Sequence, residues 1–166
     1  MYFGLSEEQQ SLEDNIKKYL EDNASLDTIK EVAGGDSAKA ENIHKGLVEL
    51  GISGLMVPEQ YGGLELDMLF ASVVSGALGA GTAPVPFAGS YVMAPIALSL
   101  GGSESQKETW LPKIAGGEVI IGIGISEYVG AREDAAITFS DNTISGRCLF
   151  VIDAKNADAY ILANKA

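Results

Sequence analysis

Few side chains in this sequence have the types and spacing that catalysis or metal binding requires. His44 is the only histidine and Cys148 the only cysteine, so neither has the further ligands of a metal site or the partners of a catalytic triad. We interpret His44 as a structural or solvated helix residue and Cys148 as a small apolar residue in a strand. Gly122 and Gly124 lack the third glycine and the following helix of a dinucleotide-binding loop.

Two other segments combine polar and turn-forming residues. Residues 57–64 contain a proline and two adjacent glycines, and glycine can adopt backbone conformations with positive φ. Ser126 and Glu127 end an apolar segment, and a polar loop with Arg132 follows them, which is a common position for ligand-binding groups. From the residues alone, we expect the first segment to be a turn and the second to be a solvated loop.

Composition narrows the class of protein. The chain has 166 residues, with 23 acidic against 11 basic side chains and a net charge of −12, which argues against nucleic-acid binding. A single cysteine fits a reducing compartment. Residues 1–8 have neither the basic start of a secretory signal nor the arginines of a transit peptide. We therefore predict a cytoplasmic protein.

A long window without charge lies in the middle of the chain, from Met68 through Ser103. A membrane span needs about 20 mainly apolar residues, whereas glycines and prolines interrupt this window at residues 79–86. We predict no membrane span but two buried helices joined by a turn. Because these helices have no charged face, we expect other protein to cover them on every side.

Hydrophobic periodicity predicts helices in the first part of the chain and strands in the second. Ser6 and Ser103 each begin a Ser-x-x-Gln capping pattern, and Gly51 stands where a left-handed residue ends a helix. The first predicted helix begins at Ser6, and three further helices cover about residues 37–50, 68–78 and 90–100. The last predicted helix runs from Ser103 through Ile114. The predicted strands lie near 119–125, 137–139, 143–144, 148–152 and 159–162, with a turn at Asp141 and Asn142.

These elements predict an α+β fold class with two domains. An N-terminal all-α domain covers residues 1–117, and a partial β domain covers residues 118–166. So short a β segment makes few strands, so we expect further chain or a partner to cover at least one sheet edge.

Several segments together resemble the acyl-CoA dehydrogenase family over essentially the whole chain. The most specific segment runs from Leu50 through Leu64. The other matching segments are 3–10, 94–98, 101–107, 110–115 and 117–118. The resemblance implies an N-terminal helical domain, a middle barrel-like β domain and a C-terminal four-helix domain, with FAD between the last two. On this basis the chain stops inside the β domain, and the C-terminal domain is missing.

The resemblance also implies a reaction. In this family a carboxylate removes the α-proton of an acyl-CoA thioester, while the β-hydrogen leaves as a hydride to the flavin. Hydrogen bonds to the thioester carbonyl stabilise the enolate-like charge. The family's catalytic base lies in the C-terminal helices, so we assign no catalytic residue in this chain. Electron-transfer flavoprotein is the implied electron acceptor, and the implied assembly is a homo- or hetero-oligomer of related subunits.

Site residues are carried over from the family position by position. The predicted flavin contacts are Ile123, Ile125, Ser126, Phe150, Val151 and Ile152, and the predicted substrate contacts are Ala131 and Arg132. Ser126 keeps the hydroxyl of the family's threonine. Ile152 stands where threonine or serine is usual, so a side-chain donor is lost there, while backbone contacts remain available with any side chain.

Three functions follow from the resemblance. The first is an FAD-dependent acyl-CoA dehydrogenase with relaxed motifs, or one subunit of a dehydrogenase built from two related chains. The second is a non-catalytic, FAD-poor subunit of a heteromeric acyl-CoA dehydrogenase. The third is a flavin monooxygenase or nitroalkane oxidase of the same architecture.

Overall fold

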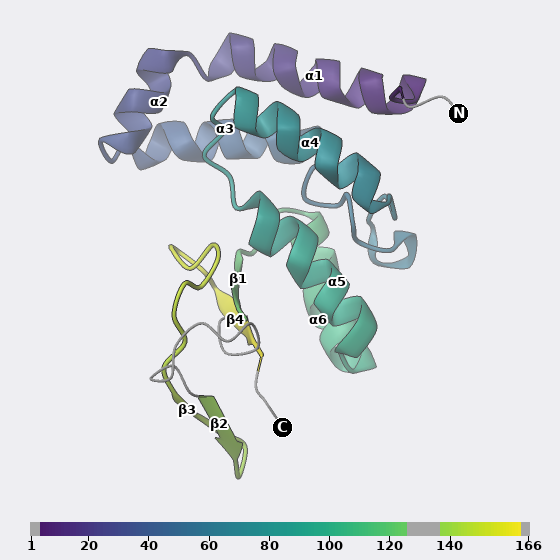
Figure 1. The fold of residues 1–166 in the computed structure, drawn as a ribbon, viewed down its shortest axis with the longest axis vertical. Coiled ribbons are helices and arrows are strands. Elements are labelled where there is room, and N and C mark those ends of the chain that lie inside the picture. The colour runs from purple at the N-terminus through teal and green to yellow at the C-terminus, as the bar shows by residue number, and fades with distance from the viewer. Residues whose placement is uncertain (1–3, 126–136, 164–166) are drawn as a thin grey trace.

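Helices make up most of the computed structural model, which describes residues 4–125 and 137–163. The helical elements are α1 (Glu7–Asn23), α2 (Leu26–Ala33), α3 (Ser37–Glu49), the short 3₁₀ turn η1 (Glu59–Tyr61), α4 (Met68–Ala80), the π-helix η2 (Phe87–Met93), α5 (Ala94–Gly101) and α6 (Glu104–Ala115). The strands are β1 (Ile121–Gly124), β2 (Ile137–Ser140), β3 (Thr143–Gly146) and β4 (Ala159–Leu162). Figure 1 shows helices in the upper and middle part of the molecule, β1 and β4 at the height of α5 and α6, and the β2–β3 hairpin at the lower end.

The helix ends follow local sequence signals. Ser6 Oγ accepts the N–H of Gln9 at 3.2 Å while the Gln9 side chain accepts the N–H of Ser6, and Ser103 and Gln106 repeat this arrangement at α6. Gly51 has φ +87° just after α3, which confirms the predicted left-handed glycine. The helix α2 was not predicted.

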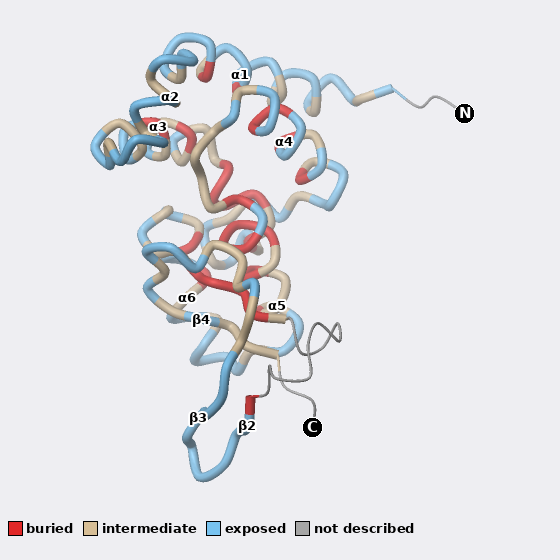
Figure 2. Tube along the Cα trace, turned by 60° about the vertical axis from the view of Figure 1, so that its left-hand side comes forward, coloured by how far each residue is buried: buried red, intermediate tan, exposed pale blue. Residues whose placement is uncertain are grey.

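The prediction of a single helix over residues 90–100 is wrong, because two different helical elements occupy this region. The π-helix η2 begins at Phe87, and α5 continues from Ala94. Pro95 has no N–H and cannot bond to the carbonyl of Tyr91, which favours a widened turn at this point. Figure 2 shows buried residues concentrated on the inner side of the helices, and five of the seven residues of η2 are buried.

Only one face of α4 is covered by the described part of the chain, so the expectation that other protein covers every side of the uncharged window stays a prediction. The inner face of α4 is buried next to α1, which crosses it, whereas its other face is open to solvent in the described part of the chain. The exposed residues on that face include Met68, Leu69, Ser72, Ser75 and Gly76.

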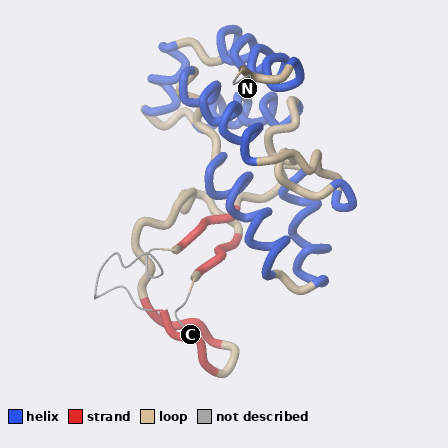
Figure 3. Tube along the Cα trace, turned by 45° about the vertical axis from the view of Figure 1, so that its right-hand side comes forward, coloured by secondary structure: helices blue, strands red, loops and turns tan. Residues whose placement is uncertain are grey.

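The strands form two separate pairs. β1 and β4 are parallel, with Ile121 opposite Ala159, and β2 and β3 form an antiparallel hairpin that extends away from the helices (Figure 3). Asp141 and Asn142 both have positive φ at the predicted hairpin turn. The strand expected at 148–152 is wrong, because positive φ at Phe150 interrupts the extended chain. Ile152 forms an isolated bridge with Ile123. The α+β class is confirmed.

Candidate functional site

The predicted flavin contacts form two tracts along the sequence, the first at 123–126 and the second at 150–152. The tracts meet where Ile123 pairs with Ile152. Each of these residues donates its backbone N–H to the carbonyl of the other, both at 2.9 Å. Ile123 is buried in the middle of β1, and Ile125 follows the strand in a half-buried position. Since β4 occupies the other edge of β1, β1 is held on both sides, and its end is fixed next to the second tract.

The second tract leaves part of its backbone available. Phe150 has φ +53° and a side chain that is 77% exposed, and Val151 is half-buried. Within the described residues, the backbone groups of Phe150 and Val151 make no hydrogen bond to the protein. Free backbone donors and acceptors next to aliphatic side chains fit a flavin, whose ring has a polar edge and apolar faces.

Three predicted site residues lie outside the described part of the chain. They are Ser126, which would supply a hydroxyl to the flavin, and the two predicted substrate contacts Ala131 and Arg132. Their roles stay predictions.

Two polar residues that the sequence analysis did not select connect the tracts to the helices. Asp153 directly follows the second tract, and its Oδ2 accepts the N–H of Gly89 at 2.7 Å and the N–H of Ser90 at 3.1 Å. Ser90 is fully buried in η2, and its Oγ accepts the N–H of Ile121 at 2.9 Å. The only signs of these roles in the sequence are that Asp153 is an acid next to an apolar tract and that Ser90 is a serine within the uncharged window.

A third polar residue holds the start of β1 from the other side. Asp158, which directly precedes β4, accepts the N–H of Ile120 at 2.8 Å through Oδ2. Backbone donors of two consecutive residues, Ile120 and Ile121, are therefore bonded by side chains from different elements. This arrangement fixes the position at which β1 leaves the helical part of the chain.

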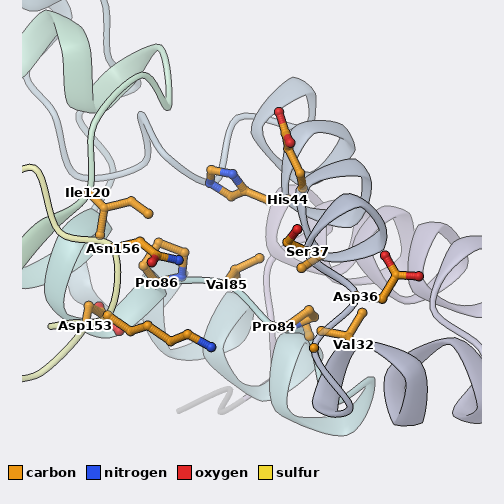
Figure 4. A pocket seen from close by; sticks show the side chains of 15 residues that line it. Val32, Asp36, Ser37, His44, Pro84, Val85, Pro86, Ile120, Asp153 and Asn156 are labelled. Carbon is orange, nitrogen blue, oxygen red and sulfur yellow. The ribbon is translucent and has the colours of Figure 1, made fainter.

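A cavity of about 740 Å³ lies between α3, residues 83–86 and residues 153–156. In Figure 4, His44 stands on one side of it, and Ile120, Asp153 and Asn156 stand on the other. None of the predicted flavin residues in the described part of the chain, Ile123, Ile125 and residues 150–152, lines this cavity.

His44 has a structural partner at the edge of this cavity. Its Nε2 is hydrogen-bonded to the hydroxyl of the buried Tyr91, and the two rings are nearly parallel with centroids 5.9 Å apart. Burial lowers the pKa of His44, against a smaller opposing effect of the Glu41 charge, so the imidazole is neutral at pH 7. Burial, with a further contribution from the Asp153 charge, raises the pKa of Tyr91, which keeps its phenol protonated.

Neither metal binding nor membrane insertion is indicated by the residues that can be described. Over 4–125 and 137–163, no three His, Cys, Asp or Glu side chains are grouped so that they could hold a metal ion. Over the same ranges, every helix is too short or too polar to cross a membrane.

Comparison with known proteins identifies the family. Solved structures with TM-scores above 0.7 share this arrangement of helices followed by strands. Residues 6–118 match the family model described as the acyl-CoA dehydrogenase N-terminal domain. The chain therefore belongs to the acyl-CoA dehydrogenase family.

Three similar proteins illustrate the relationship. (2S)-methylsuccinyl-CoA dehydrogenase of Cereibacter sphaeroides is 32% identical over 123 residues, which cover 70% of this chain and 21% of that protein. The FAD complex of PigA has a TM-score of 0.79 at 20% identity, with 100% of this chain and 45% of that chain covered. The ChsE4–ChsE5 complex from Mycobacterium tuberculosis has a TM-score of 0.76 at 22% identity, with 99% and 44% covered. The chain thus spans less than half the length of each of these proteins.

Proposed function

We propose that the protein containing this chain is an FAD-dependent acyl-CoA dehydrogenase that introduces a double bond between the α and β carbons of an acyl-CoA thioester. Family membership supports the reaction class. The observation that carries the assignment of a flavin site to this chain is the pairing of Ile123 with Ile152. Next to this pair, the backbone groups of Phe150 and Val151 make no hydrogen bond within the residues that the structure describes.

Each part of the chain has a role in this proposal. FAD, when bound, accepts the hydride that leaves the substrate. Ile123, Ile125 and residues 150–152 would hold the flavin through backbone groups and aliphatic contacts, and Ser126 would donate a hydrogen bond to it. Ala131 and Arg132 would contact the substrate. The carboxylate that removes the α-proton would come from chain outside residues 1–166.

The proposal extends to organisation and partners. We assign residues 1–117 to a helical domain and residues 118–166 to a β domain. Electron-transfer flavoprotein is the proposed electron acceptor, and the proposed assembly is a homo- or hetero-oligomer. One structural neighbour is an electron-transferring flavoprotein of Acidaminococcus fermentans, and another is a two-component complex.

The test uses the full-length protein encoded by the gene. Visible absorbance of the purified protein measures bound flavin, and mass spectrometry of products from a panel of acyl-CoA thioesters detects the loss of two hydrogen atoms. We expect Ser126→Ala to weaken FAD binding and Ser126→Thr to preserve it, because threonine keeps the hydroxyl. A hydroxylated product would contradict the dehydrogenase assignment and favour a monooxygenase.

A second candidate function is a non-catalytic, FAD-poor subunit of a heteromeric acyl-CoA dehydrogenase. The observation that favours it is Ile152, whose side chain cannot donate a hydrogen bond where the family usually has a hydroxyl. Absence of flavin after reconstitution of the purified full-length chain with FAD would support this function. Flavin retained by a homo-oligomer would exclude it.

A further inference from the structure

One buried serine links both candidate flavin tracts to the π-helix η2. The Ser90 N–H is donated to Asp153, which adjoins the second tract, and Ser90 Oγ accepts the N–H of Ile121 in β1, the strand of the first tract. Ser90 has no exposed surface. Its two bonds are therefore shielded from water, where an unpaired polar group is costly.

The second tract also makes an unusually close approach to η2. A Cβ atom placed on Gly89 would lie 2.6 Å from Asp153 Oδ2 and 3.1 Å from Ile152 Cγ2. Any side chain at position 89 would push the carboxylate away from the two backbone donors that it accepts. The contact therefore requires glycine at position 89 as well as the Asp153 carboxylate.

The geometry of η2 explains why these donors are available. In a π-helix the hydrogen bonds span five residues instead of four, and such turns occur often at functional sites. Gly89 N–H and Ser90 N–H lie near the start of η2, where backbone donors have few partners within the helix. Asp153 Oδ2 accepts both N–H groups, and the Ser90 N–H is shared with the carbonyl oxygen of Pro86 at 3.2 Å.

We propose that Asp153 and Ser90 are positioning residues that set the relative placement of the two flavin tracts on η2, and thereby the affinity of the site for FAD. This inference rests on the proposed function that the chain binds FAD. Asp153 adjoins Ile152, and Ile152 pairs with Ile123. Displacement of the carboxylate would therefore shift the second tract against β1 without removing any group that touches the flavin.

The first test compares Asp153 with Asp67, which also accepts two backbone N–H groups through one oxygen atom but lies in another part of the chain. Asp67 Oδ1 accepts the N–H of Leu69 at 2.9 Å and of Phe70 at 3.1 Å at the start of α4, and α4 contains none of the candidate flavin residues. In the full-length protein, we expect Asp153→Ala to weaken FAD affinity about tenfold, a loss typical of a broken charge-assisted contact. Asp67→Ala should lower thermal stability but leave FAD affinity unchanged.

Two further variants separate positioning from general stability. Asp153→Asn keeps an oxygen that can accept both N–H groups, so it should restore most of the FAD affinity. Gly89→Ala leaves Asp153 in place but inserts a methyl group into the contact, so it should weaken FAD affinity as Asp153→Ala does. Hydrogen exchange of the apoprotein provides a readout without flavin. We expect faster exchange at residues 121–123 and 150–153 in both weakened variants.

The outcomes distinguish this inference from the proposed function. If the wild-type protein binds no FAD, the proposed function fails, and this inference fails with it. If the wild type binds FAD and Asp153→Ala binds it equally well, only the positioning role is overturned. The same holds if Asp67→Ala reduces affinity as much as Asp153→Ala, or if neither Asp153→Ala nor Gly89→Ala folds, because the contact would then serve folding in general.

Discussion

Ser90, Asp153 and Asp158 show how single polar side chains connect distant segments of this chain. Each of them accepts a backbone N–H from a segment far away in sequence, at 2.7 to 3.1 Å. The sequence gives no periodic signal for such contacts, since serine and aspartate are equally common in solvated loops. The fold brings distant segments next to these residues, and this proximity is what turns them into structural connections.

His44 leads to a prediction for the pH dependence of stability. Burial lowers its pKa in the folded state below the unfolded value of about 6.5, so protonation favours unfolding. The stabilisation is complete above about pH 6.5 and declines as the pH falls through the folded-state pKa. We expect the stability difference between wild type and His44→Gln to shrink from pH 7 to pH 5, measured by urea unfolding. An unchanged difference would contradict this expectation.

At the level of elements, some helix ends are set by local sequence signals, whereas other elements depend on tertiary contacts. The capping serines and Gly51 act within one helix turn, so the sequence located α1, the end of α3 and the start of α6. The two elements at 87–101 and the irregular course at 148–152 depend on contacts with other segments, including the pairing of Ile152 with Ile123. Hydrophobic patterning contains no information about such partners.

The turn at residues 57–64 allows a comparison of two glycines. A Cβ atom on Gly63 would lie 2.0 Å from the carbonyl oxygen of Val57, whereas a Cβ on Gly76, on the exposed face of α4, would meet nothing within 4 Å. We expect Gly63→Ala to destabilise the protein by about 3 kcal/mol and Gly76→Ala to stabilise it by about 1 kcal/mol. Denaturant unfolding measures both changes. Similar effects of the two substitutions would contradict the steric explanation.

Over the whole molecule, we expect backbone amides to be better protected from hydrogen exchange in the helices than in the β2–β3 hairpin. The core lies among the helices, with Ile16, Leu47 and Val74 fully buried, whereas β3 is exposed throughout and β2 buries only Ile137. An isolated two-stranded hairpin is only marginally stable. In residues 1–166, we therefore expect amides of β2 and β3 to exchange much faster than those of α1, α3 and α4, measured by hydrogen exchange and mass spectrometry. Equal protection would show that the hairpin has stabilising contacts beyond its own pairing.

The uncharged window shows which feature of the packing of the whole molecule could not be predicted from the sequence. Absence of charge correctly indicated helices with buried apolar faces, but it did not indicate which face of α4 is buried. That choice follows from the packing of α1 and η2 against it. The other face carries Met68 and Leu69, more than half exposed in the described part of the chain.

The sequence by itself determined the α+β class, most helices, the hairpin turn and the family, because caps, glycines and short motifs act locally or recur as recognisable strings. Only the tertiary structure decided that the tracts around Ile123 and Ile152 pair with each other, and that Asp153 and Ser90 connect them to η2. These contacts join residues that are 29 to 64 positions apart. Their partners are selected by packing of the whole chain, which spacing along one segment cannot encode.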